Sequence, residues 1–142
     1  MKRNNLDIRS VEKRDMSDVV ELLQSMSEFK PSESDFDAIW DEFYNQSNVF
    51  PIVALIDEIV VGYGSIVIET KIRGGKMGHI EDIVSHVDYG KKGIGKGIVD
   101  ALFDIAKQNG CYKVTLQCKE HNVPFYNKCD YEISGLAMQR FV

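Results

Sequence analysis

The sequence predicts one domain, residues 1–142, of mixed α/β architecture, in which helices cover both faces of a mixed sheet. Three observations support this fold class. Strand-like and helix-like patterns follow one another in the order β-α-α-β-β-β-α-β-α-β. Short connections in the middle of the chain predict hairpins, so much of the sheet should be antiparallel. A strand-helix-strand succession near the C-terminal end predicts a crossover and therefore a parallel strand pair.

The N-terminal third predicts one strand and two amphipathic helices. Residues 6–11 alternate in polarity, as a strand does, and residues 14–26 read as a helix with Asp15 as the expected N-cap. The sequence KPSES breaks this helix, and Ser34 can cap a second one over residues 35–45. Each helix carries an apolar stripe at helical spacing, which favours burial in the core or a lid over a cofactor site. The stripes are Val19, Leu22, Leu23 and Met26, and then Phe36, Ile39, Trp40 and Phe43.

The middle of the chain predicts three strands. Residues 50–57 and 59–71 are joined by a tight Asp57-Glu58 connection, and two glycines inside the second strand, Gly62 and Gly64, indicate a bulge or bend. The sequence RGGKMG is expected to be a loop. The next stretch, GHIEDIVSHV, is apolar on both faces and should be a central strand.

The last third predicts two more helices between strands. Residues 94–110 form an amphipathic pattern with Gly110 as its C-cap, followed by a strand, YKVTLQC. The segment NVPFYNKC predicts a short helix that tolerates Pro124 in its first turn. The closing sequence, YEISGLAMQRFV, is expected to add one or two strands.

Composition disfavours several classes of protein. Hydrophobic residues make up 44% of the chain and charged residues 27%, as in ordinary globular proteins. The net charge of −5 disfavours a nucleic-acid binder. No apolar run is long enough to span a membrane, and no apolar segment follows the basic N-terminal residues, so no secretory signal is indicated. These features predict a cytoplasmic location.

The cysteines and histidines do not predict a metal site. Cys111, Cys118 and Cys129 form no C-x-x-C pair, and their odd number indicates free thiols that usually pack as small hydrophobic residues. Cys118 and His121 have a ligand-like spacing, but no second pair completes a site. We therefore expect no bound metal.

A glycine- and lysine-rich segment, YGKKGIGKG (residues 89–97), lies between the predicted central strand and the helix after it. Backbone N–H groups at a helix N-terminus bind anions, and glycines let a ligand approach them. The segment lacks the Ser or Thr that ends a P-loop, because Gly97 stands there, and its glycine spacing does not fit a dinucleotide fingerprint. Taken alone, it could equally be a glycine-rich helix cap with solvated lysines.

This segment, following a central strand, resembles the pyrophosphate arm of the GNAT acetyltransferases. Gly93 and Gly95 fit the pattern of that arm, whereas Gly90 stands where the family has Gln or Arg. Over residues 78–142, the stretches GHIEDIV, GCYKVTLQC, N-V-x-F-Y-x-K-C and AMQ resemble the GNAT branch that acetylates glucosamine 6-phosphate. The resemblance implies a twisted, mostly antiparallel sheet with one splayed parallel strand pair. It also implies acetyl-CoA as co-substrate, an amino sugar phosphate as acceptor and a role in UDP-N-acetylglucosamine synthesis.

The resemblance also implies where acetyl-CoA would bind. Backbone groups near Ile83 and Val84 would pair with the pantetheine chain like an added strand. Asn122 and Lys128 would also contact the cofactor. The pyrophosphate would lie on the glycine segment, at Lys91, Lys92, Gly93, Ile94, Gly95 and Lys96.

For the chemistry, the resemblance places three residues beside the reacting atoms. Glu81 would accept the proton of the amine, and the backbone carbonyl of Gln117 would hold that amine. Tyr126 would protonate the departing thiolate, since a phenol with a pKa of about 10 can act as a general acid. In the predicted short helix, Tyr126 lies one turn from Asn122, on the same face.

Asp82 and Ser27 would bind the sugar. Because adjacent side chains of a strand point to opposite faces, Glu81 and Asp82 are not expected to form a carboxylate dyad. Such core-edge carboxylates are also common as purely structural groups, and Tyr126 could simply anchor its helix.

The sugar phosphate needs a cation. In the family, the C-terminal strand of a second subunit supplies it, which implies a homodimer. Phe141 stands at the aligned position, so the role would pass to Arg140 or to another basic residue such as Lys30 or Lys128. Two other functions therefore stay open: acetylation of another small amine or a peptide, and acyl-CoA binding without turnover.

Overall fold

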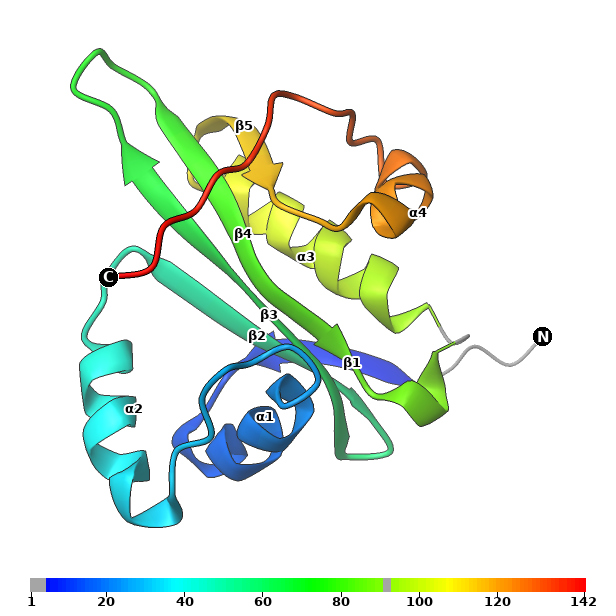
Figure 1. Ribbon diagram of the computed structural model, residues 1–142. Helices are drawn as coiled ribbons and strands as arrows, with labels where there is room; N and C mark the ends of the chain where they lie inside the picture. The colour runs from blue at the N-terminus through cyan, green and yellow to red at the C-terminus, as the bar shows by residue number, and fades with distance from the viewer. Residues whose placement is uncertain (1–4, 91–92) are drawn as a thin grey trace.

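The computed structural model describes residues 5–90 and 93–142 and confirms the mixed α/β architecture (Figure 1). Within these residues, one five-stranded sheet has the order β1-β2-β3-β4-β5. Neighbouring strands are antiparallel except β4 and β5, which are parallel. The strands are β1 (Leu6–Ser10), β2 (Val49–Ile56), β3 (Ile59–Thr70), β4 (Lys76–Ser85) and β5 (Cys111–Leu116).

Helices cover both faces of the sheet, as the sequence predicts. In Figure 1, α1 (Met16–Leu23) and α2 (Phe36–Tyr44) lie on one side, and α3 (Ile94–Gln108) and α4 (Val123–Asn127) lie on the other. One buried cluster joins α3 to the sheet through Ile66, Ile80, Ile98 and Leu102. A second cluster joins α1 to the opposite face through Val19, Val53, Tyr63 and Val84. No described helix is long and apolar enough to cross a lipid bilayer.

The N-terminal helices begin differently from the prediction. Asp15 does occupy the N-cap position of α1, but its carboxylate accepts hydrogen bonds from Arg9, at 2.7 and 2.9 Å, and from the Glu12 amide, at 2.8 Å. It therefore ties β1 to the start of the helix. The prediction of Ser34 as the second N-cap is wrong, because residues Glu33–Asp35 form a 3₁₀ turn and Asp35 stands at the N-cap of α2.

The two glycines inside β3 make room for α3. A Cβ atom on Gly62 would come within 2.7 Å of the Ile98 side chain, and one on Gly64 equally close to the same residue. The pairing of β3 with β4 shifts register between Tyr63 and Ser65, which confirms the predicted bulge. β4 begins at Lys76, so the expected loop RGGKMG is shorter than predicted.

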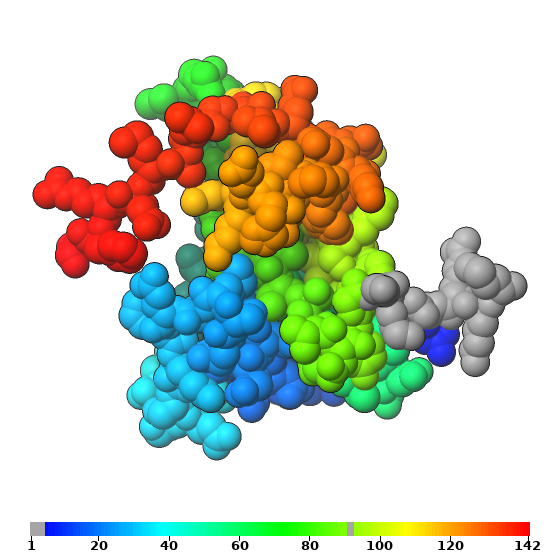
Figure 2. Space-filling view, turned by 45° about the vertical axis from the view of Figure 1, so that its right-hand side comes forward, coloured from blue at the N-terminus to red at the C-terminus, as the bar shows by residue number. Residues whose placement is uncertain are grey.

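The predicted C-terminal strand is absent from residues 131–142, all of which the structure describes. This segment is extended: residues 131–137 lie near β5 and α4, and the last residues, red in Figure 2, leave the body of the molecule. Its apolar side chains, among them Leu136, Met138 and Phe141, are 95%, 96% and 73% exposed. Strand-like composition alone does not form a strand, because a strand needs a neighbour that pairs with its backbone.

Candidate active site

The parallel strands β4 and β5 separate in the middle of the sheet. Their last paired residues are Ile80 and Leu116, after which β5 ends while β4 continues to Ser85. The next residues along the two strands are Glu81 and Gln117, which lie at the opening of the splay. The predicted splayed pair is confirmed. In Figure 2, β4 (green) is visible at the bottom of a recess between the α4 region (orange) and the segment after α1 (blue).

A β-bulge changes the direction of the side chains at this opening. Glu81 is paired with Ser65 and Val84 with Tyr63, so Asp82 and Ile83 together face the single residue Gly64. Asp82 accommodates the bulge with φ of +55°, in the left-handed region that aspartate tolerates better than most residues. Alternation along β4 is thereby interrupted.

The bulge overturns the expectation that Glu81 and Asp82 point to opposite faces. Ile80 and Ile83 both pack in the cluster under α3, so Glu81 between them points to the face of α1 and α2. Asp82 lines a cavity on that same face. The two carboxylates are thus neighbours on one side of the sheet, and the sequence signal that reports this is Gly64 on the partner strand.

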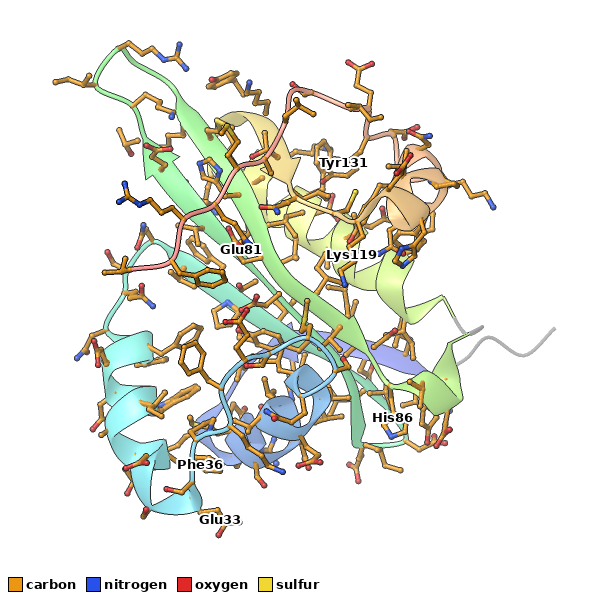
Figure 3. The ribbon with its side chains drawn as sticks, in the orientation of Figure 1. Glu33, Phe36, Glu81, His86, Lys119 and Tyr131 are labelled. Atoms are coloured by element: carbon orange, nitrogen blue, oxygen red, sulfur yellow. The ribbon has the colours of Figure 1, made fainter. Side chains whose placement is uncertain are left out.

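Glu81 has the electrostatic environment of a base. Partial desolvation by the surrounding chain raises the pKa of its carboxyl group, although the side chain as a whole is exposed at the opening. The negative charge of Asp82 raises that pKa further, while His79 opposes both. A carboxylate with a raised pKa holds a proton more readily at neutral pH and is better suited to accept one from an amine. In Figure 3, Glu81 lies midway along β4. Lys119 is labelled on the loop that leads from β5 to α4.

The cavity beside Asp82 has a volume of about 240 Å³. Ser27 also lines it, so the structure brings together the two residues predicted to bind the sugar. The Ser27 hydroxyl donates to the Phe29 carbonyl at 2.8 Å and accepts from the Phe29 amide at 3.0 Å. Most of the remaining wall is apolar and comes from α1 and α2, including Ile39, Trp40 and Phe43 of the predicted stripe.

A second cavity, of about 520 Å³, lies between the end of β5, α4 and the C-terminal segment. Tyr126 and Gln117 both line it, so two of the three predicted catalytic groups share one space. Burial raises the pKa of the Tyr126 phenol, which keeps it protonated at neutral pH. A protonated phenol is the form that a general acid requires.

Sequence reasoning missed two residues of this second cavity, Cys118 and Tyr131. Cys118 is exposed, whereas we expected a buried thiol. The Tyr131 hydroxyl is buried with no hydrogen-bond partner among the described residues, and burial raises its pKa to about 12. Figure 3 shows Tyr131 beside α4. Nothing in the local sequence distinguishes these two residues from ordinary packing residues.

The glycine segment begins α3 as predicted. Gly93 is the N-cap with φ of +72°, and the first helical hydrogen bond runs from the Gly97 amide to the Gly93 carbonyl at 3.0 Å. The amides of Ile94, Gly95 and Lys96 therefore have no partner within the helix and can bind an anion. The Lys96 ammonium group donates to Asp100 at 2.6 Å. Lys91 and Lys92 lie outside the described residues.

Helix α4 lies beside this first turn of α3. A Cβ atom on Gly95 would lie 3.2 Å from the ring of Phe125, so a larger residue there would require that ring to shift by a few tenths of an ångström. Asn122 is the N-cap of α4 and Lys128 its C-cap, and both are exposed. Helix α4, which carries these two predicted cofactor residues at its ends, thus contacts the first turn of α3 through Phe125.

One predicted site residue is not brought to either cavity within the chain. Arg140 lies in the exposed C-terminal segment and, of the described residues, is not among those that line either cavity. Among residues 5–90 and 93–142, no cluster of three or more His, Cys, Asp or Glu side chains could hold a metal ion.

Comparison with known proteins gives one consistent family. Residues 16–131 match the model of the acetyltransferase (GNAT) family. The chain is 37% identical over 127 residues to glucosamine 6-phosphate N-acetyltransferase 1 of Dictyostelium discoideum, covering 86% of this chain and 81% of that protein. It is also similar to the glucosamine 6-phosphate N-acetyltransferase of Candida albicans, with 37% identity over 112 residues, 75% of this chain and 74% of that protein.

A solved structure agrees with these relatives. The crystal structure of glucosamine-6-phosphate N-acetyltransferase from Arabidopsis thaliana superimposes with a TM-score of 0.87 at 31% identity, covering 96% of this chain and 98% of that one. The splayed strand pair, the glycine turn at the start of α3 and these matches agree, and the chain belongs to the GNAT family of acetyltransferases.

Proposed function

We propose that this protein transfers the acetyl group of acetyl-CoA to the amine of D-glucosamine 6-phosphate. The products are N-acetyl-D-glucosamine 6-phosphate and coenzyme A, and the amine attacks directly while both substrates are bound. The reaction would serve UDP-N-acetylglucosamine synthesis, and we place the enzyme in the cytoplasm. The relatives named for this reaction and the layout of the splay support the proposal.

Acetyl-CoA would bind along the opening between β4 and β5. The edge of β4 at Ile83 and Val84 is not paired with β5, so its backbone groups can pair with the pantetheine amides. The free amides from Gly93 to Lys96, with Lys91 and Lys92, would take the pyrophosphate. This path leads from the first turn of α3 toward Glu81 and directs the thioester at the splay.

The proposed chemistry uses one acceptor and one donor of protons. The amine nitrogen attacks the thioester carbonyl, the carbon–sulfur bond breaks, and the Tyr126 phenol gives its proton to the departing sulfur. Glu81 takes the proton that the amine loses, directly or through water. The carbonyl of Gln117, which follows the last pair of β5, would hold the amine in line with the thioester. Because the carbonyl belongs to the backbone, this role does not depend on which side chain residue 117 carries.

The sugar would occupy the cavity of Ser27 and Asp82. Its phosphate would be held in a homodimer, with Arg140 reaching the site from the partner's C-terminal segment. The exposed apolar side chains of residues 133–142 support this arrangement, because such a segment is stable when another chain covers it.

One observation carries the proposal most directly. The parallel strands separate directly before Glu81 and Gln117, and Tyr126 lines the same cavity as Gln117. A binding module that never turned over acyl-CoA would not need a proton acceptor and a proton donor at the two sides of one opening.

The test follows coenzyme A release from acetyl-CoA with a thiol reagent, in the presence of glucosamine 6-phosphate, glucosamine or no acceptor. Protein alone is the necessary blank, because the free thiol of Cys118 is exposed and therefore accessible to the reagent. Release with the phosphorylated sugar alone supports the proposal. Equal release with both sugars moves the assignment to another small amine, and acetyl-CoA binding without any release supports the binding module.

A further inference from the structure

A row of polar side chains crosses three strands just before the splay. His79 on β4 bonds through Nε2 to Oε1 of Glu69 on β3 at 3.0 Å, and through Nδ1 to Oγ1 of Thr115 on β5 at 3.2 Å. The same Glu69 oxygen is 2.9 Å from the ammonium nitrogen of Lys71. This row, Lys71–Glu69–His79–Thr115, links β3, β4 and β5 through side chains in addition to their backbone ladders.

The row holds its connections in either protonation state of the imidazole. Lys71 and His79 both lower the pKa of Glu69, so its carboxylate is ionised at neutral pH and can only accept hydrogen bonds. Nε2 of His79 therefore carries a hydrogen. Nδ1 then accepts from the Thr115 hydroxyl when the ring is neutral and donates to it when the ring is charged.

The position of the row matters for the site. His79 and Thr115 are paired across β4 and β5, the next pair is Ile80 and Leu116, and the strands separate directly after it. Among the strands of residues 5–90 and 93–142, β5 lies at the edge of the sheet, with β4 as its single neighbour. The end of an edge strand is where a ladder frays, so a side-chain link at this point limits how far Leu116 and Gln117 can move.

We propose that His79 is a positioning residue, which through Thr115 holds the end of β5 so that the Gln117 carbonyl stays at a fixed distance from Glu81. This inference rests on the proposed function, because it assigns to Gln117 and Glu81 the two sides of the bound amine. His79 itself does not touch the reacting atoms. Its effect is geometric, and displacement of a reacting group by about 1 Å costs roughly 100-fold in rate.

The experiment compares four variants of the full chain. His79→Leu removes both links of the imidazole, and Thr115→Val removes the link to β5 with almost no change in shape. The double variant combines them. Thr70→Val, at the exposed end of β3, is the matched control. Measured quantities are kcat, KM for both substrates, the melting temperature and amide hydrogen exchange of the segment 111–118.

Both single variants should lose at least about tenfold in kcat, with KM for acetyl-CoA within about twofold of the unmodified protein. The kcat of the double variant should equal that of the less active single variant, because the two changes break one connection and their effects do not add. Exchange in segment 111–118 should accelerate in all three variants and stay unchanged in Thr70→Val. If His79→Leu lowers the melting temperature strongly, the isosteric Thr115→Val decides the outcome.

Two results overturn the inference. One is a kcat within twofold of normal in both single variants of an active protein. The other is unchanged exchange in segment 111–118, whatever the activity. If the unmodified protein does not acetylate glucosamine 6-phosphate, the proposed function has failed by itself, and hydrogen exchange then decides whether His79 holds β5.

Discussion

Replacing Glu81 by Gln tests the assignment of the base. The substitution keeps the size of the side chain and removes its ability to accept the amine proton. General base catalysis contributes about 10²- to 10⁴-fold. Glu81 is exposed at the opening of the splay, so water can partly replace it, and we expect the lower end of that range, a loss of about 100-fold in kcat.

The pH dependence of the reaction provides a second test of Glu81 as the base. Burial and the neighbouring Asp82 raise the pKa of Glu81, and the base is active when ionised. Activity should therefore rise with pH through a value above the ordinary 4.3 or so of a glutamate. Asp82→Asn removes the negative neighbour and should move this limb of the kcat/KM profile to lower pH, whereas Glu81→Gln should abolish the limb.

The assay is coenzyme A release at saturating acetyl-CoA, between pH 5 and pH 9. Glu42→Gln, an exposed change of the same kind on α2, serves as the control and should leave rate and profile unaltered. A Glu81→Gln protein that keeps its rate within twofold and its acid limb in place would refute the role assigned to this carboxylate, even if the overall reaction is confirmed.

Three further perturbations follow from the structure. Tyr126→Phe removes the acid and should lower kcat about 100-fold while acetyl-CoA binding, followed by calorimetry, is retained; an unchanged kcat contradicts the role. Asp15→Asn weakens the buried pair with Arg9 and should lower the free energy of unfolding in urea by about 2–3 kcal/mol, less than for a fully buried pair because the Arg9 side chain is 29% exposed. The pair lowers the pKa of Asp15, so its stabilisation is present above the unfolded value of about 3.9 and is lost as pH falls through the folded value; a difference between the two proteins that persists unchanged at pH 2 would contradict this. Gly62→Ala places a Cβ atom 2.7 Å from the Ile98 side chain and should lower the free energy of unfolding by about 1–3 kcal/mol in the same urea measurement. An unchanged free energy of unfolding would mean that α3 shifts freely, and it would contradict this packing argument.

Much of the fold was predictable because local signals agree with the tertiary contacts. The apolar stripe of α3 and the glycine at its N-cap are recognisable in the sequence, and they coincide with the buried face and the positive φ of the structure. The glycines of β3 likewise indicated the bulge. In each of these cases the residue type has few alternative roles, so the sequence pattern is specific.

The candidate site was predictable in its residues and not in its geometry. A strand pattern implies strict alternation, and the bulge at Asp82 and Ile83 interrupts it, so the orientation of Glu81 relative to Asp82 was predicted wrongly. The segment after Tyr131 has the composition of a strand, but residues 131–142 form no strand in the structure because they pair with no neighbouring strand. Both errors arise where the conformation of a residue depends on a partner strand.

The order of the elements, the helix start that can bind an anion and the motifs of the family can all be recognised in the sequence. These properties follow from neighbouring residues, whose propensities and spacing act over a few positions. Three further properties depend on the folded arrangement: the point where β4 and β5 separate, the side of the sheet that Asp82 faces, and the connection of Glu69 to Thr115 through His79. These depend on the register between strands far apart in the chain, and register is set by the packing of α1 and α3 against the two faces.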